Sequence, residues 1–321
     1  MKARRAALAF ALPTLLVAGA ALAWPDRPVR FVVPAPPGGT MDVMARVVGT
    51  HLSPRLGQPV IVDHRPGGGG ALAVQAVLDA APDGHTLLFT GSSVLTEIPH
   101  VLALRYDTLT DLKPVADLGR AYLLAIAHPA VPASSLSELV AHAKRNPRKL
   151  SYASYGPGTV AHYAGLIFNR KEGIDLQHVP YKGSPPALAD VMAGHVPLMF
   201  DGIVTSLPHI RSGKVKAFAI SSRSRSRLLP QVPTFAELGY PEIDFANWIG
   251  VAASARMSSA LAATINRELL ALVAMPGVRE RLLELGFEPT PASTPERLAA
   301  MVRAEFERNA RIVSAFDIRF E

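Results

Sequence analysis

The feature that most constrains the fold is an alternation of short β-rich runs with longer helical patterns, which continues almost from end to end of the chain. The stretch from Ser135 shows the spacing of a helical capping box with Glu138. Strands that alternate with helices are typical of α/β proteins with mainly parallel sheets and helices on both faces. Nine runs are expected to be strands, and they begin at Val29, Pro59, His85, Tyr122, Leu150, Asp175, Val196, Val215 and Trp248.

The end of the chain has a different character. Three amphipathic helices are expected from Met257, Pro276 and Thr294, separated by proline and glycine. The chain has 321 residues, and the 298 that follow the first 23 are enough for two domains of about 150 residues each. We expect the three helices to pack back on one of these domains.

The first 23 residues resemble a secretory signal rather than part of the fold. They combine a basic start, an apolar run over residues 6–20 and the small residues Ala21–Ala23. The rival interpretation, an uncleaved anchor, is disfavoured because the run contains Pro13 and is shorter than the roughly 20 residues of a spanning helix. We expect cleavage before Trp24.

Charge and cysteine content narrow the function classes. The chain has no cysteine, which excludes disulfides and thiolate chemistry and suits a bacterial periplasm. The formal charge is +7, and loss of Lys2, Arg4 and Arg5 with the signal leaves +4. The densest basic run, Ser221–Pro230, has no interleaved aromatic residue, so a solvated loop is expected rather than a nucleic-acid surface.

Enzyme signatures are missing from the sequence. It contains no GxSxG, HExxH or P-loop pattern, and its ten histidines show no metal-site spacing. Neither a cofactor nor a metal is therefore predicted. Two other classes stay open: a secreted hydrolase on an α/β frame that uses Ser92 or Ser93 with a nearby histidine, and a surface adhesion protein.

A glycine-rich stretch after the second predicted strand partly matches a nucleotide-binding pattern. Gly68, Gly70 and Ala73 fit GxGxxA, but the next strand ends without the acidic residue that binds a ribose. The preferred interpretation is a loop that lets a helix begin close to the sheet.

Two strand-turn-helix connections, one in each half of the chain, share glycine, proline and threonine. The first is "VVPAPPGGTMD" at Val32–Asp42, and the second is "YGPGTVAH" at Tyr155–His162. Each can be a tight connection, or a backbone that approaches an anion at a helix N-terminus. His162 can bond local backbone or contact a ligand. A cleft between two α/β domains would use both turns on one anion.

With further segments, these turns resemble a known family. "PAPPGGTMD", "VDHRPGGGG", "APDGHTLLFTGSS", "SYGPGTVAH", "HVPYKGSPPALADVMAGHVPLMFD", "LPHIRSGKVKAFAISS" and "LPQVPTFAELGYP" occur in the order and spacing of the tripartite tricarboxylate transporter receptors, also called the Bug family. The resemblance covers essentially the whole chain after the signal.

The resemblance implies a two-domain periplasmic binding protein of the Venus-flytrap, type II-like kind, with two crossover segments. It places residues 24–123 and 249–321 in domain 1 and residues 124–248 in domain 2. It also implies hinge closure on one small carboxylate, delivery to a permease or a sensor, and a monomer. Dicarboxylates, tricarboxylates, acidic amino acids and aromatic acids all stay open as ligands.

The resemblance and the turn chemistry together select the candidate ligand-binding residues. In the first turn, Asp42 is expected to hold water or local amides, unless it points into the cleft. The sequence does not place Arg120 or Lys182 in or out of the cleft. The candidates are Pro37, Gly38, Gly39, Thr40, Asp42, Ser92, Ser93, Tyr155, Gly156, Gly158, Thr159, His162, Tyr181, Gly183 and Asp201.

Overall fold

The computed structural model describes residues 24–290, 293–316 and 318, so the predicted signal segment lies outside the described residues. All nine predicted strands are present in the described chain. They are β1 Val29–Val33, β2 Val60–His64, β3 Thr86–Gly91, β4 Leu112–Ala127, β5 Ser151–Ser154, β6 Gln177–Pro180, β7 Leu198–Gly202, β8 Lys216–Ile220 and β9 Ala246–Ser254.

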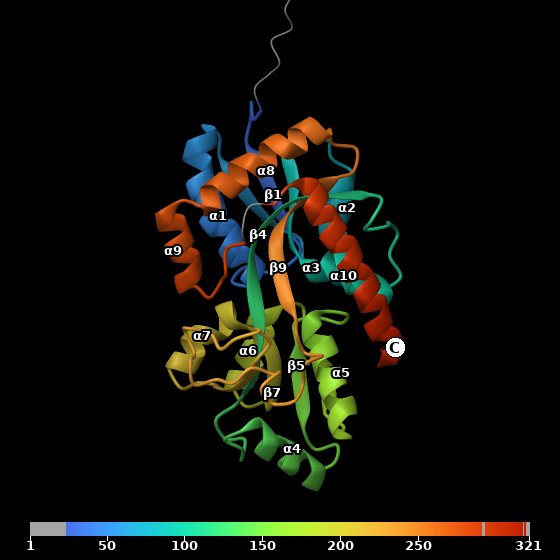
Figure 1. Cartoon of the computed structure of the whole chain (residues 1–321), viewed down its shortest axis with the longest axis vertical. Coiled ribbons are helices and arrows are strands. Elements are labelled where there is room, and N and C mark those ends of the chain that lie inside the picture. Colours follow the sequence, from blue (N-terminus) through green and yellow to red (C-terminus); the bar gives the residue numbers. More distant parts are fainter. Residues whose placement is uncertain (1–23, 291–292, 317, 319–321) are drawn as a thin grey trace, which may run out of the picture.

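The strands form two sheets that share β4. The first sheet has the order β2-β1-β3-β9-β4, and in the second β4 lies between β8 and β7, followed by β5 and β6. The sheet around β1 and the sheet around β5 each belong to one lobe, called here the first and the second lobe (Figure 1). This α/β architecture confirms the predicted fold class.

Each sheet is mixed rather than mainly parallel. The strands linked through helices, β1 with β2 and β3, and β5 with β6 and β7, pair in parallel. The pairs made by β4 and β9 are antiparallel, because these two strands carry the chain between the lobes in opposite directions. Their own register runs from Leu112 opposite Ser254 to Tyr122 opposite Ala246, and they lie side by side between the lobes in Figure 1.

Helices cover both sheets. Ser135 caps its helix as predicted, and its hydroxyl accepts from the Glu138 amide at 3.2 Å. The three predicted C-terminal helices are also present, and they belong to the first lobe (Figure 1). The helices are α1 Thr40–Leu56, η1 Gly68–Gly70, α2 Ala71–Leu78, α3 Ser92–Thr96, η2 Ile98–His100, α4 Leu136–Arg145, α5 Val160–Glu172, α6 Ser184–Met192, α7 Ile203–Arg211, α8 Ser259–Val273, α9 Pro276–Glu284 and α10 Pro295–Ala315.

Each lobe has an apolar core under its sheet. Phe31 and Phe89 pack in the first lobe with ring centroids 5.1 Å apart, and Tyr152 packs edge-on against Phe200 at 5.6 Å in the second. Within the described residues, no single helix is long and apolar enough to cross a membrane, and α8 with α9 reaches that length only as a pair bent by 74°. The strands β4 and β9 connect the two lobes.

Candidate functional site

A cavity of about 480 Å³ lies between the two lobes. The first lobe lines it with residues 34–36 and 39–41 after β1, residues 66–70 after β2, and residues 91, 93 and 94 at the end of β3. The second lobe contributes the turns after β5, β6 and β7. Both crossover strands line it as well, through Tyr122 on β4 and Asn247 on β9.

Six helices begin at this cavity, and none is capped by the side chain of its own N-cap residue, although the Ser92 amide at the start of α3 donates to Asn247 Oδ1 at 3.1 Å. The N-cap residues are Gly39 for α1, Gly70 for α2, Gly91 for α3, Thr159 for α5, Gly183 for α6 and Gly202 for α7. Of the described α-helices that begin elsewhere, α4, α8 and α10 are each capped by a serine or threonine hydroxyl, and α9 has no side-chain cap. Free first-turn amides and the helix dipole favour an anion, so the cavity is electropositive without needing a cationic side chain.

The Pro-Pro-Gly-Gly turn before α1 is held from behind by Asp42. The Asp42 carboxylate accepts from the Gly38 amide at 2.7 Å, from Arg46 Nε at 3.1 Å and from His64 Nε2 at 2.6 Å. Burial raises the pKa of Asp42, but these hydrogen bonds outweigh it and hold the pKa below its usual value. Asp42 therefore fixes the turn and does not line the cavity. The sequence led us to expect that Asp42 holds local amides, and its bond to the Gly38 amide is of that kind.

The turn before α5 is stabilised within itself. Thr159 Oγ1 donates to the Gly156 carbonyl at 2.6 Å, and the Gly158 amide donates to His162 Nδ1 at 3.2 Å. The His162 ring stacks on His178 at 4.1 Å, and burial lowers the pKa of His162 to about 4. Of the two alternatives for this histidine, the structure shows the local backbone bond.

Contacts between the lobes are close around the cavity, so the structure is a closed form. A Cβ at Gly183 would lie 2.5 Å from Pro36 Cγ in the other lobe. Tyr163 Oη on α5 donates to the Glu97 carbonyl of the first lobe at 2.9 Å. These contacts hold the two lobes against each other beside the cavity.

Eight of the fifteen predicted ligand-binding residues line the cavity and seven do not. Those that line it are Gly39, Thr40, Ser93, Tyr155, Gly156, Thr159, Tyr181 and Gly183. Those that do not are Pro37, Gly38, Asp42, Ser92, Gly158, His162 and Asp201. A role in ligand contact stays a prediction for the first group.

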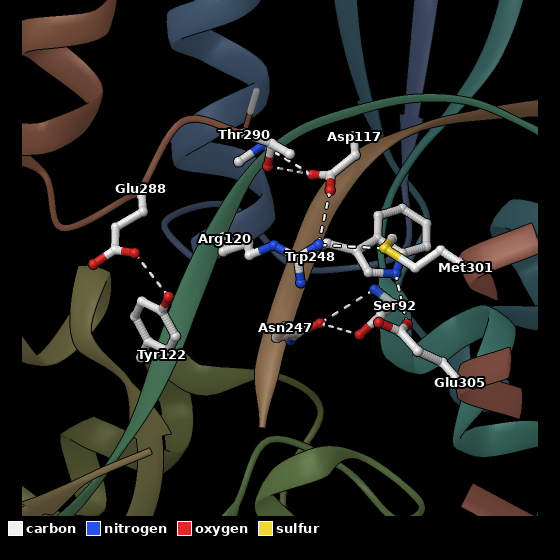
Figure 2. Close-up of polar contacts among 11 residues, drawn as sticks. Ser92, Asp117, Arg120, Tyr122, Asn247, Trp248, Glu288, Thr290, Met301 and Glu305 are labelled. Carbon is white, nitrogen blue, oxygen red and sulfur yellow. Dashed lines mark hydrogen bonds and ion pairs between the residues drawn. The ribbon is translucent and has the colours of Figure 1, made fainter. Parts of the chain in front are cut away.

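The residues outside the lining support it instead. Ser92 donates through Oγ to Asn247 Oδ1 at 2.6 Å, which ties the start of α3 to the crossover strand β9 (Figure 2). Asp201 is fully buried on β7, and its Oδ2 accepts from Thr205 and Ser206 at 2.7 Å each. Burial raises the pKa of Asp201 despite these hydroxyls.

The structure also places the two basic residues that the sequence left open. Arg120 points away from the cavity toward Asp117 Oδ2 at 3.3 Å and Met301 Sδ at 3.3 Å (Figure 2). Lys182 lines the cavity, but its side chain is exposed. No group of three or more His, Asp or Glu residues suited to a metal occurs in the described part of the chain.

Sequence reasoning missed several contributors to the cavity, among them the apolar side chains of Val94, Ile98 and Leu102. Residues 66–70 do let α2 begin close to the sheet, as expected, but they also line the cavity. Their signal was available, because this glycine run follows a parallel strand in the same way as the turn before α1. Tyr122 and Asn247 carried no local signal, since only the pairing of β4 with β9 brings them to the cavity.

Comparisons with known proteins agree with this geometry. Protein BugT of Bordetella pertussis is 36% identical over 292 residues, which cover 90% of this chain and 89% of BugT. The solved structure of R. palustris Rpa4515 with adipate has a TM-score of 0.89 and 30% identity, covering 92% of this chain and 99% of that one. MatC from Rhodopseudomonas palustris with bound malate has a TM-score of 0.84 and 33% identity, covering 90% and 100%.

Two α/β lobes joined by two crossover strands around one cavity define a two-domain solute-binding receptor. Residues 44–318 match the family described as the tripartite tricarboxylate transporter family receptor. The chain belongs to this family, as its motifs indicated, and it is a solute-binding protein.

Proposed function

We propose that this receptor binds the carboxylate group of a small ligand through the uncapped N-terminal amides that meet at the cavity. The observation that supports this proposal is that these amides come from both lobes, through α1 on one side and α5, α6 and α7 on the other. A carboxylate that accepts from both sides binds the closed form better than the open one, which is the condition for ligand-driven closure. Adipate and malate in the two relatives support a carboxylate.

Closure would bend the two crossover strands where they leave their shared ladder. We place the hinge at residues 121–128 and 246–251, between a domain of residues 24–123 and 249–321 and a domain of residues 124–248. A few dihedral changes in two connecting strands are enough for such a motion. The Tyr163 contact with Glu97 would then form only on closing.

We also propose where the receptor works and to which proteins it passes its ligand. The match to a receptor family supports a monomer exported to the periplasm, with cleavage near Ala23, that passes its ligand to a permease or a sensor. It also supports binding without turnover. Of the two nucleophiles considered for a hydrolase, Ser92 donates to Asn247 rather than to a histidine, and the Ser93 hydroxyl has no hydrogen-bond partner among the described residues.

The test is a thermal-shift screen of refolded, ligand-free protein against a panel of carboxylic acids. A ligand at 100 times its dissociation constant stabilises the folded state by about 2.7 kcal/mol, a shift of several degrees. Gly39→Ala should abolish the shift, because Gly39 has an extended backbone that alanine tolerates and its new methyl would lie at the cavity. Gly277→Ala, in open space on α9, is the matched control.

Two outcomes would contradict the proposal. One is a shift by a non-acid and by no acid, and the other is an unchanged shift in Gly39→Ala. Recovery of a chemically altered ligand after incubation would contradict the part that excludes turnover.

A further inference from the structure

The cavity has an apolar end. Ile98 Cγ2 and Leu102 Cδ1 lie 2.8 and 2.7 Å from where a Cβ of Gly69 would stand, and Val94 Cγ2 lies 3.1 Å from that of Gly70. These three side chains therefore press against a bare glycine backbone and line the cavity there. We call Val94, Ile98 and Leu102 the apolar wall.

Another part of the cavity lining is polar. Thr40 Oγ1 lies 2.8 Å from where a Cβ of Gly202 would stand, so the N-termini of α1 and α7 meet here. No side-chain hydrogen bond of Thr40 occurs among the described residues, which leaves its hydroxyl available to a ligand. Gly39 and Gly183 line the same part.

Three other hydroxyls that line the cavity are already used. Those of Ser93 and Ser184, which are 7% and 6% exposed, have no hydrogen-bond partner in the described chain. A buried hydroxyl of this kind favours one neutral polar group on a ligand. The occupied donors are Tyr122 to Glu288 at 2.7 Å, Tyr181 to Asp190 at 2.6 Å and Thr159 to Gly156 at 2.6 Å.

The apolar wall offers little charge compensation, because the amides beside it are already bonded. The Gly70 and Ala71 amides donate to the Gly67 and Gly68 carbonyls, and the Ser92 amide donates to Asn247 Oδ1 at 3.1 Å. Lys182 is the one basic side chain among the described residues that line the cavity, and it is exposed. A carboxylate pressed against the apolar wall would lose its hydration without gaining a cation or a hydroxyl in return.

We infer that the ligand is an amphipathic monocarboxylate rather than a di- or tricarboxylate. This inference rests on the proposed function, the binding of a carboxylate in the cavity. Its carboxylate lies at Gly39, Thr40 and Gly202, and its apolar body lies along the apolar wall. One neutral polar group on that body meets Ser93.

The test compares acids that differ only by a second carboxylate. Calorimetric titration of ligand-free protein with hexanoate against adipate, butanoate against succinate, and benzoate against terephthalate measures the ratio directly. In at least one pair the monoacid should bind at least about tenfold tighter than the diacid. The comparison of hexanoate with adipate is the most informative of the three, because the structure of a relative contains adipate.

A cation placed in the apolar wall should reverse the preference. Leu102 is only partly buried, so Leu102→Lys can fold, and it should improve diacid binding relative to the monoacid by about tenfold. Leu238→Lys, at an exposed leucine outside the cavity lining, is the control and should leave the ratio unchanged.

The possible outcomes distinguish failure of this inference from failure of the proposed carboxylate-binding function. Diacids that bind as tightly as their monoacids, or an unchanged ratio in Leu102→Lys, would overturn the inference and leave a carboxylate receptor standing. Failure of every acid in the three pairs to bind would overturn both.

Discussion

Substitution of Gly202 by alanine would act at the contact between the lobes. Gly202 has φ −67° and ψ 141°, a conformation that alanine adopts freely. A Cβ here would lie 2.8 Å from Thr40 Oγ1 across the gap between the lobes. Non-bonded atoms in contact normally lie about 3.5–4.0 Å apart, so the lobes could not close fully. The open form would be unaffected.

The expected loss follows from that overlap. Overpacking costs about 1–3 kcal/mol. Because it is felt only in the closed form, ligand affinity should fall by about 5- to 150-fold while the unliganded melting temperature stays near that of wild type. Calorimetric titration with the tightest acid of the panel measures the affinity, and solution X-ray scattering with and without that acid measures closure.

A double-mutant cycle identifies the colliding atom. Thr40→Ala removes Oγ1, so adding Gly202→Ala to that background should cost little further affinity. Gly277→Ala again controls for a glycine change remote from the cavity. Unchanged affinity in Gly202→Ala, or an equal loss on both backgrounds, would refute closure across this contact.

Three further predictions concern the closed form, pH and capping. Tyr163→Phe removes the hydroxyl that donates to Glu97, so ligand affinity should fall several-fold, corresponding to about 1 kcal/mol, and an unchanged calorimetric affinity would contradict a role in closing. The pKa of His162 is lowered to about 4 by burial, whereas the unfolded chain titrates near 6.5, so stability should fall as the pH drops from 6.5 toward 4. The loss attributable to this residue is about 2 kcal/mol at pH 5; urea unfolding should show it in wild type and less of it in His162→Gln. Thr294→Ala removes the cap of α10 and should cost about 1 kcal/mol of unfolding free energy with ligand affinity unchanged, and a change in affinity would contradict a purely structural cap.

Local pattern was enough to predict most of the secondary structure. The strands and the C-terminal helices have periodic apolar residues and clear ends, so they could be found without tertiary information. The first half of β4 was missed, because Pro114 and Gly119 interrupt it. The register with β9 shifts near both residues, so this half is held by its neighbour rather than by its own propensity.

The site was predictable where backbone chemistry determines it. A glycine between a strand and a helix indicates an exposed helix N-terminus, and Gly39 and Gly183 line the cavity as expected. Side-chain direction was less predictable. His162 and Asp201 lie within the predicted motifs, yet their side chains do not line the cavity: His162 accepts from the Gly158 amide, and Asp201 accepts from hydroxyls on α7. Asn247 depends on strand pairing between distant segments, which one sequence does not show.

The central claim is that uncapped backbone amides recognise a carboxylate. The most direct measurement is calorimetric titration of ligand-free wild-type protein with the tightest acid of the panel and with the primary amide of that acid. The two molecules have nearly the same shape and differ in charge. The account predicts that the acid binds and that its amide binds at least about 100-fold more weakly, a difference of about 2.7 kcal/mol. Equal affinities would contradict it.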